Sequence, residues 1–257
     1  MRELVKTGFK LRYQDSVLGY LWSLLKPIFL FTVLYIVLVG FLGIGAGDPT
    51  WPVSLLLGIV LWNFFSEITG TGLSSIVDRG DMIRKVNFPK YVIILSNSFL
   101  ALINLALNFV VIAIFMVVNH IELTWSAAFL PIYILELFVF ALGLAFLLSA
   151  LFVKLRDINY IWEIIMQALF YGSVVMFPLA IVISRSQQFA EILLLNPIAS
   201  IIQGARHVVV NPDSNPTLYT LTGNIWLELI PIVIVVATFV IGALYFKRRS
   251  PRFAEEI

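Results

Sequence analysis

Residues 28–47 read IFLFTVLYIVLVGFLGIGAG, a continuous stretch without a charged side chain. A helix needs about 20 apolar residues to cross a hydrocarbon core of ~30 Å, so this stretch is long enough to span a membrane. Further predominantly apolar runs of similar length occur at residues 52–72, 91–118, 125–153, 158–183 and 225–246. The sequence therefore predicts an all-α membrane protein with six transmembrane helices.

The composition also indicates a membrane environment. Of the 257 residues, 60% are hydrophobic and 12% are charged, whereas a soluble domain averages about 45–50% and about 25%. The chain has no cysteine, which excludes disulfides, thiolate metal sites and cysteine nucleophiles. Its two histidines, His120 and His207, are far apart in the sequence, so we expect neither a metal ion nor another cofactor in this chain.

The distribution of Lys and Arg predicts the orientation of the spans. In a six-span arrangement, every Lys and Arg except Arg185 and Arg206 falls on one side of the membrane. The positive-inside rule assigns that side, with both termini, to the cytoplasm. A seventh span would place the basic C-terminal residues outside, which disfavours it. No small-residue cleavage pattern follows the basic N-terminal segment, so the first span is expected to remain as an anchor.

Three segments between or beside the spans have patterns of their own. Residues 1–14 contain apolar and basic faces, which indicates either an amphipathic helix in the cytoplasmic interface or a basic flank that sets topology. Residues 78–90 contain a short basic stretch that ends at a Phe-Pro step, and form either a docking helix or a solvated loop. Residues 187–210 are interrupted by an Asn-Pro step, which predicts a pair of re-entrant or surface-lying helices on the outer side.

Glu67 and Glu136 lie within predicted spans. An unpaired charge at the bilayer centre costs roughly 3 kcal/mol or more, so each carboxylate should face water or the protein interior. These two residues are candidate functional carboxylates, for example in a proton relay. Glu163 and Glu228 lie nearer to span ends and are expected at an interface.

Several short motifs follow one another along the chain. They are YQDSVLGYLWSLLKP at 13–27, RKVNFPK at 84–90, FVKLRDINYIWE at 152–163, Phe177-Pro178, and Asn196-Pro197 followed by Arg206. In this order the motifs resemble the ABC-2 class of exporter permeases, specifically those that move O-antigen and teichoic acid. The resemblance covers essentially the whole chain.

The resemblance implies a single ABC-2 transmembrane domain over residues 1–257 that works as a homodimer. Each copy would bind a separate ABC ATPase subunit, so two permeases and two ATPases would form one exporter. ATP and Mg²⁺ would be bound by that partner, and the chain, which has no phosphate-binding loop motif, is not expected to be an enzyme. The implied cargo is a lipid-linked glycopolymer, moved across the cytoplasmic membrane of a bacterium. Nucleic acid is not an expected partner.

The same resemblance assigns site residues. Segment 78–90 would be a coupling helix seated on the ATPase, and segment 187–210 would be an outer gate. The coupling residues would be Arg84, Lys85, Phe88 and Pro89, with a second contact at Arg156 and Asp157. The gate residues would be Asn196, Pro197 and Arg206. Because rings stack on the apolar faces of sugars, the candidate pathway residues are Tyr20, Trp22, Tyr160, Trp162, Phe170 and Tyr171, with helix packing as the alternative for each.

Other functions fit parts of the sequence. An ABC-2 permease for a lipid, drug or haem would share the architecture and differ in the width and polarity of its pathway. A proton-driven secondary transporter would use Glu67 or Glu136 and would transport without an ATPase. An intramembrane enzyme needs a catalytic constellation at span depth, which the two separated histidines and the expected lack of an intramembrane lysine disfavour.

Overall fold

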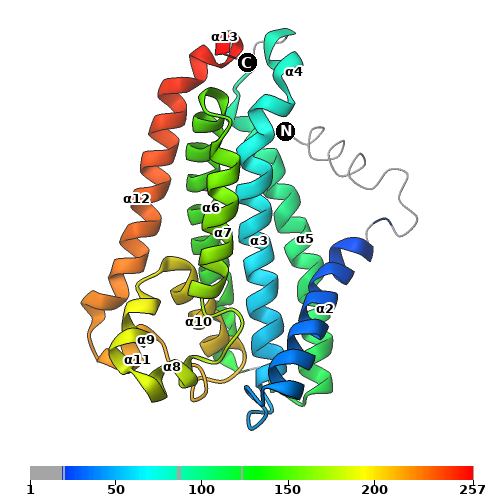
Figure 1. Ribbon diagram of the computed structural model, residues 1–257, viewed down its shortest axis with the longest axis vertical. Helices are drawn as coiled ribbons and strands as arrows, with labels where there is room; N and C mark the ends of the chain where they lie inside the picture. Colours follow the sequence, from blue (N-terminus) through cyan, green and yellow to red (C-terminus); the bar gives the residue numbers. More distant parts are fainter. Residues whose placement is uncertain (1–18, 20, 86–87, 123, 257) are drawn as a thin grey trace.

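The computed structural model describes residues 19, 21–85, 88–122 and 124–256, which form helices joined by turns and loops, without a strand. The predicted all-α fold is confirmed for this part of the chain. The amphipathic helix expected within residues 1–14 lies outside the described residues. Figure 1 shows the long helices side by side as a bundle, with short helices grouped at one end.

Five stretches of the described chain are long and apolar enough to cross a membrane. They are α2 (Leu21–Tyr35) with its π-helical continuation η1 (Ile36–Phe41), α3 (Trp51–Asp78), α5 (Tyr91–Val118), the 3₁₀ turn η2 (Trp125–Phe129) with α6 (Leu130–Lys154), and α12 (Ile225–Arg249) with the turns after it. The first stretch starts before the predicted span 28–47 and ends at Phe41, ahead of left-handed turns at Gly43 and Gly45, whose φ angles are 67° and 77°. Lys26 therefore lies inside a spanning helix, and the expectation of no intramembrane lysine is wrong.

The predicted span 158–183 is divided into two helices. α7 (Ile158–Gly172) ends after 15 residues, and α8 (Leu179–Arg185) follows a turn in which Val174 has a φ of 56°. At 1.5 Å per residue, α7 rises about 22 Å, which is less than the ~30 Å of a hydrocarbon core. The predicted boundary at 183 is wrong, because Pro178 disfavours helical backbone in the residue before it.

α7 nevertheless carries the chain from one end of the bundle towards the other. In Figure 1, α6 finishes at the upper end, α12 starts at the lower end, and α7 runs downwards between them. The lower end holds the short helices α8, α9 (Gln187–Leu194), α10 (Pro197–Val209) and α11 (Leu218–Thr222). α9 and α10 are bent by 102° at their junction, which agrees with the predicted pair of helices around the Asn-Pro step.

α3 lies at the centre of the bundle. Within its most apolar 18 residues 78% are buried, compared with 17% for the stretch that contains α2 and 22% for the stretch that contains α12. Helices in lipid gain little from apolar contact alone and often approach through small residues. α6 and α12 do so at Gly143 and Gly242, because a Cβ atom on Gly242 would overlap the carbonyl oxygen of Gly143. The outer faces of α2 and α12 are left for lipid or a partner chain.

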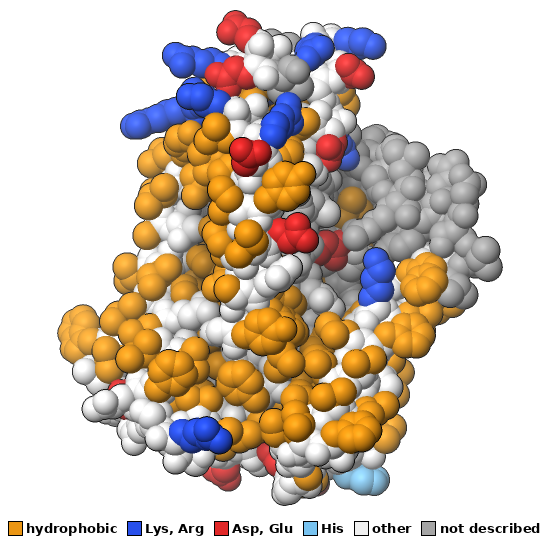
Figure 2. Space-filling view, in the orientation of Figure 1, with side chains coloured by type: hydrophobic (Ala, Val, Ile, Leu, Met, Phe, Trp, Pro, Cys, Tyr) orange, Lys and Arg blue, Asp and Glu red, His pale blue; other side chains and the backbone are white. Residues whose placement is uncertain are grey.

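Charged side chains are distributed unevenly along the bundle. Figure 2 shows Lys, Arg, Asp and Glu gathered at the upper end, above a largely apolar belt. This end, formed by α4 (Gly80–Lys85), the α6–α7 turn and α13 (Phe253–Glu256), is called the basic end below. The end that holds α8 to α11 is called the far end.

Candidate functional site

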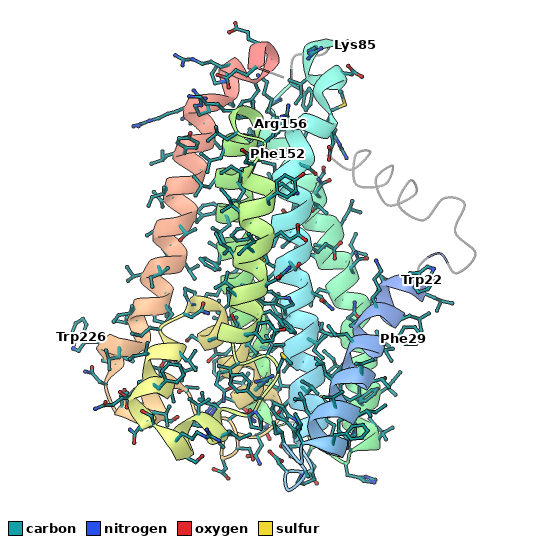
Figure 3. All side chains as sticks on the ribbon, viewed as in Figure 1. Trp22, Phe29, Lys85, Phe152, Arg156 and Trp226 are labelled. Carbon is teal, nitrogen blue, oxygen red and sulfur yellow. The ribbon has the colours of Figure 1, made fainter. Side chains whose placement is uncertain are left out.

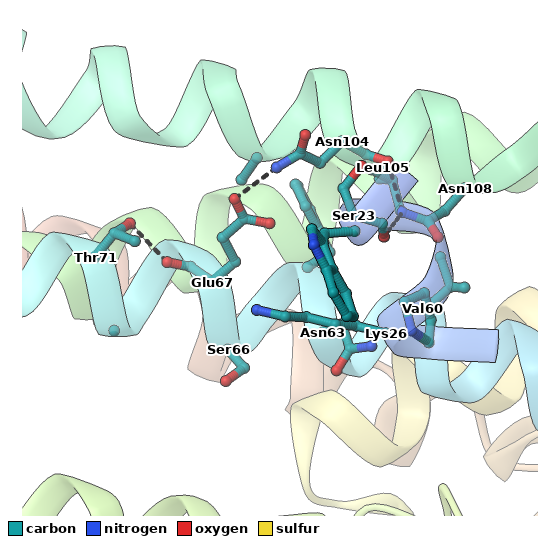
Figure 4. A pocket seen from close by; sticks show the side chains of 15 residues that line it. Ser23, Lys26, Val60, Asn63, Ser66, Glu67, Thr71, Asn104, Leu105 and Asn108 are labelled. Atoms are coloured by element: carbon teal, nitrogen blue, oxygen red, sulfur yellow. Dashed lines mark hydrogen bonds between the residues drawn. The ribbon is translucent and has the colours of Figure 1, made fainter. Parts of the chain in front are cut away.

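A polar cavity of about 880 Å³ lies among α2, α3 and α5 (Figure 4). Its lining combines charged, amide and hydroxyl groups with apolar side chains such as Trp22, Phe64 and Leu105. The polar members are Ser23, Lys26, Asn63, Ser66, Glu67, Thr71, Asn104 and Asn108. So many polar groups at span depth are stable only if water, protein or a ligand satisfies them. The cavity is therefore a candidate site for a polar ligand within the membrane.

Hydrogen bonds within α5 and to the neighbouring helices fix the amides of α5 in this cavity. Asn104 Nδ2 donates to Glu67 Oε1 at 2.8 Å, and Asn108 Nδ2 donates to the Asn104 carbonyl oxygen at 2.8 Å. Asn108 Nδ2 also reaches the Ser23 carbonyl oxygen at 3.3 Å. That carbonyl would normally bond to the N–H four residues later, but residue 27 is a proline and has no N–H. Asn108 Nδ2 therefore donates to the Ser23 carbonyl oxygen in place of the backbone N–H that Pro27 lacks.

Lys26 and Trp22 bring α2 into the same cavity. Both residues line it, and Figure 4 shows the Lys26 side chain extending between α2 and the Glu67 side of α3. An ammonium and a carboxylate in one cavity leave no large net charge at this depth, which lowers the cost of placing them there. Glu67 and Trp22 were predicted as site residues from the sequence, whereas Lys26, Asn104 and Asn108 were not. Two asparagines four residues apart in an apolar run could have revealed this face of α5.

Glu136, the second candidate carboxylate, does not join this cavity. It is half-buried on α6, and α3 and α6 both start at the far end of the bundle. Phe64 and Phe65 on α3 pack beside Phe138 and Phe140 on α6, so the helical rise places Glu136 about 8 Å nearer to the far end than Glu67, and Glu136 is not part of the lining of the cavity. The structure therefore does not bring the two carboxylates into a common relay.

Arg206 on α10 anchors the far end of the molecule. Its side chain is 0% exposed, and its three nitrogens donate to backbone carbonyl oxygens: Nε to Ser54 at 2.9 Å, Nη1 to Val174 at 2.7 Å, and Nη2 to Val175 at 2.9 Å. The guanidinium also lies 5.3 Å from the centre of the Trp51 ring. Arg206 thus joins α10 to α3 and to the turn after α7. The planar guanidinium of an arginine can donate to several carbonyl oxygens in fixed directions, which the compact ammonium of a lysine does less well.

Gly58 on α3 makes room for this anchor. A Cβ atom at this position would overlap Arg206 Nη2. The missing side chain allows the guanidinium to lie against the helix backbone and reach the Ser54 carbonyl. Nothing in the local sequence around Gly58 indicates this role.

Asn196 and Pro197 fix the start of α10 and the end of α7 together. Asn196 Oδ1 accepts from the Ile198 N–H at 3.1 Å, as an N-cap residue does, and Pro197 takes the first helical position. Asn196 Nδ2 donates to the Gly172 carbonyl oxygen and to Ser173 Oγ, both at 3.1 Å. The last carbonyls of a helix lack partners within the helix, so this contact stabilises the C-terminal end of α7 at Gly172. The three residues predicted for a gate are thus connected through one turn.

The predicted pathway aromatics fall into two groups. Tyr160 and Tyr171 on α7 are 68% and 62% exposed, and Trp22 on α2 is exposed as well. Trp162 is only 8% exposed and packs on Phe65, and Phe170 packs on Trp62 with ring centres 5.3 Å apart. Tyr20 lies outside the described residues.

The predicted coupling residues lie together at the basic end. Arg84 and Lys85 end α4 and are exposed, and Figure 3 shows Lys85 and Arg156 at this end of the bundle. The Arg156 guanidinium stacks on Phe152 at 5.1 Å, and Asp157 precedes α7. The described segments thus present two exposed basic elements that are separate in sequence and close to the same end.

Comparison with known proteins gives the class to which this fold belongs. The family described as ABC-2 type transporter matches residues 1–210, so the chain belongs to the ABC-2 type transporter family. The resemblance inferred from the motifs is therefore confirmed, and the chain is a multi-pass membrane protein with five described stretches long and apolar enough to cross a membrane.

Curated relatives are O-antigen export system permease proteins. One from Myxococcus xanthus, named RfbA, is 31% identical over 139 residues, which cover 54% of this chain and 53% of the relative. A Klebsiella pneumoniae protein of the same name is 31% identical over 124 residues, covering 48% and 47%, and another is 29% identical over 142 residues, covering 54% of each. The chain spans about half the length of the curated relatives it matches.

Proposed function

We propose that this chain is the permease subunit of an ATP-driven exporter that moves a lipid-linked polysaccharide, of the O-antigen or teichoic acid class, across the cytoplasmic membrane. The observation that carries the proposal is membership of the ABC-2 type transporter family together with relatives that are O-antigen export permeases. Two copies of a separate ABC ATPase would supply ATP hydrolysis, because the sequence has no phosphate-binding loop motif.

In this proposal the basic end faces the cytoplasm. The positive-inside rule supports that orientation, since Lys and Arg gather at this end. α4 would then be the coupling helix, with Arg84, Lys85, Phe88 and Pro89 against the ATPase, and Arg156 and Asp157 would form the second contact. ATP-driven closure of the two ATPases would move these elements and, through α7, the anchored helices at the far end.

The surface of α7 supports a homodimer or a shared aqueous pathway. Asn159, Glu163 and Gln167 are all exposed and follow one another at a spacing of four residues, so they share one helix face. Polar side chains on a lipid-facing surface are costly. A second copy of the chain, or a hydrated pathway between two copies, removes that cost. The exposed rings of Tyr160 and Tyr171 would then be available to a passing glycan.

The polar cavity favours a hydroxyl-rich cargo over a drug or haem. Amide and hydroxyl groups both donate and accept hydrogen bonds, as sugar hydroxyls do. Lys26 adds a cation that complements the phosphate of a lipid-linked precursor. Depletion of the protein in its host should leave the lipid-linked polymer on the cytoplasmic side, as measured by labelling surface glycans in intact and in broken cells. Unchanged surface glycan would argue for the other cargoes.

Affinity purification from native membranes tests the exporter assignment. We expect an ATPase subunit to co-purify in equal amount and to hydrolyse ATP. Alanine at Arg84, Lys85 and Phe88 together should abolish co-purification, because it removes the basic and aromatic contacts of the coupling segment. A matched control replaces Arg248 and Arg252, which are also exposed at the basic end, and should retain the ATPase.

The opposite result has a specific meaning. If the chain purifies alone and drives transport under a proton gradient without ATP, a secondary transporter that uses Glu67 or Glu136 replaces the exporter assignment. The variants Glu67→Gln and Glu136→Gln would then identify the carboxylate by loss of transport.

A further inference from the structure

A second cavity, of about 450 Å³, lies at the basic end between the start of α5 and the end of α12. Its floor is aromatic, since the rings of Phe146 on α6 and Phe246 on α12 pack with centres 5.2 Å apart. Phe88 and Tyr91 form part of its wall, and Tyr91 is exposed at the start of α5. The cavity therefore offers an apolar slot, open at one side.

The charged residues that line this slot are both basic. They are Lys90 and Lys247, and the described lining contains no acidic side chain. Lys90 Nζ donates to the Ser250 carbonyl oxygen at 2.6 Å, which holds the ammonium at the junction of α5 and α12. Lys247 is exposed in the last turn of α12. The carboxylate of Glu256 pairs with Arg249 at 3.4 Å, and Glu256 does not line the slot.

The slot opens beside a surface suited to lipid. Val240, Ile241 and Leu244, which precede Lys247 on α12, are exposed and apolar. The change from exposed apolar residues to Lys247, Arg248 and Arg249 along one helix is typical of the boundary between acyl chains and headgroups. Basic pockets between transmembrane helices at this level suit anionic headgroups.

We propose that this slot binds one anionic phospholipid from the leaflet around the basic end. Its headgroup phosphate lies between Lys90 and Lys247, and one acyl chain lies on Phe146 and Phe246 beside Ala243. Inorganic phosphate would use the lysines and leave the apolar floor uncovered. A zwitterionic lipid would cover the floor but add its own cation next to the lysines. An anionic phospholipid provides a negative headgroup for the two lysines and an acyl chain for the apolar floor.

The position of the slot gives the lipid a consequence for coupling, which rests on the proposed function. Phe88 and Pro89 belong both to the slot and to the segment that links α4 to α5. Phe253 of α13 is fully buried against Phe246, with ring centres 5.3 Å apart, and α13 contacts α4. A lipid in the slot therefore packs behind the coupling segment and stiffens its connection to α12.

Lipid binding to the purified full-length chain tests the proposal without an ATPase. The chain is prepared in a neutral detergent and titrated with phosphatidylglycerol, phosphatidylcholine or inorganic phosphate, and retained lipid is counted by native mass spectrometry. We expect one tightly retained phosphatidylglycerol, at least fivefold weaker retention of phosphatidylcholine, and no protection by phosphate in a thermal unfolding assay. Since a surface Lys contributes about a fivefold gain in binding to anionic lipid, Lys247→Gln should weaken retention by about that factor.

Matched variants separate the slot from general surface charge. Arg248→Gln removes the same charge from the next residue, which does not line the slot, and should change retention less than twofold. Ala243→Phe fills the slot and should abolish retention of the single lipid, while Ala237→Phe, at an exposed position of the same helix, should not. If Ala243→Phe does not fold, the comparison of lipid retention in Lys247→Gln and Arg248→Gln still tests whether the lipid binds in the slot. Equal retention of both lipids, equal loss in Lys247→Gln and Arg248→Gln, or protection by phosphate alone would overturn the proposal.

Discussion

Two polar regions of the bundle, one around Arg206 and one around Glu67, differ in whether their polar groups are buried against protein or face a cavity. Around Arg206, every contact is buried, and the cation is satisfied by three backbone carbonyl oxygens and one ring. Around Glu67, side chains from three helices face a cavity of about 880 Å³. In the first region the guanidinium is matched by three acceptors that the protein itself supplies. The second presents its polar groups to a cavity that can hold water or a ligand.

The difference suggests different roles for polar residues in one bundle. A closed, matched site contributes to stability, since any lost partner leaves a buried group unsatisfied. An open site costs less when altered, because water can replace a lost partner. We therefore expect the Arg206 region to hold the far-end helices in place and the cavity to interact with cargo.

Replacing Arg206 should have the largest effect on stability. Arg206→Met leaves three buried carbonyl oxygens without the donors they have now, and each buried group left unsatisfied costs about 1–3 kcal/mol. The loss is measured as a fall in the unfolding midpoint of the purified protein in detergent, followed by helical circular dichroism. Arg185→Met, at the exposed end of α8, is the control and should change stability by less than about 0.5 kcal/mol. Equal midpoints for the two variants would mean that the Arg206 site is not closed.

Gly58→Ala should have an intermediate effect. The new Cβ atom would overlap Arg206 Nη2 and displace the guanidinium, and overpacking of this kind costs about 1–3 kcal/mol. Gly70→Ala on the same helix meets open space and should be neutral, or stabilising by up to about 1 kcal/mol through helix propensity.

A double substitution shows whether Gly58 acts through Arg206. In the Arg206→Met background, Gly58→Ala should cost much less than alone, because the atom that it displaces is gone. Additive costs would assign the effect of Gly58 to something other than the anchor.

Asn104→Leu should have the smallest effect on stability. It removes the donor to Glu67 Oε1, but water in the cavity can replace that donor, so we expect a cost of about 1 kcal/mol or less. The same unfolding assay measures it. A loss as large as that of Arg206→Met would show that the cavity is closed in the membrane and would remove the contrast between the two regions.

Much of the fold was predictable because hydropathy is a local property. The runs around α3, α5, α6 and α12 gave spans close to the observed helices, and the Asn196-Pro197 step indicated the bend between α9 and α10. The start of the first span was predicted too late, since Lys26 and Pro27 were assigned to its flank. Both residues are tolerated in α2 because the cavity accepts the ammonium and Asn108 covers the carbonyl that Pro27 leaves free.

The candidate site was predictable only in part. Glu67, Arg206 and Asn196 stood out as polar residues in apolar surroundings, which is a property of each position alone. Their partners did not stand out. Glu67 is bonded to Asn104, Arg206 to Ser54 and to the turn after α7, and Asn196 to Gly172, all distant in sequence.

The sequence by itself determined which segments enter the membrane and which end of the bundle is basic, because both follow from the transfer energy of individual side chains between water and lipid. The tertiary structure alone decided which carbonyls Arg206 satisfies and which polar residues share a cavity. Those outcomes depend on hydrogen bonds between helices. Such bonds form only after the helices have packed, so the hydrogen-bond partner of a residue cannot be inferred from its own position in the sequence.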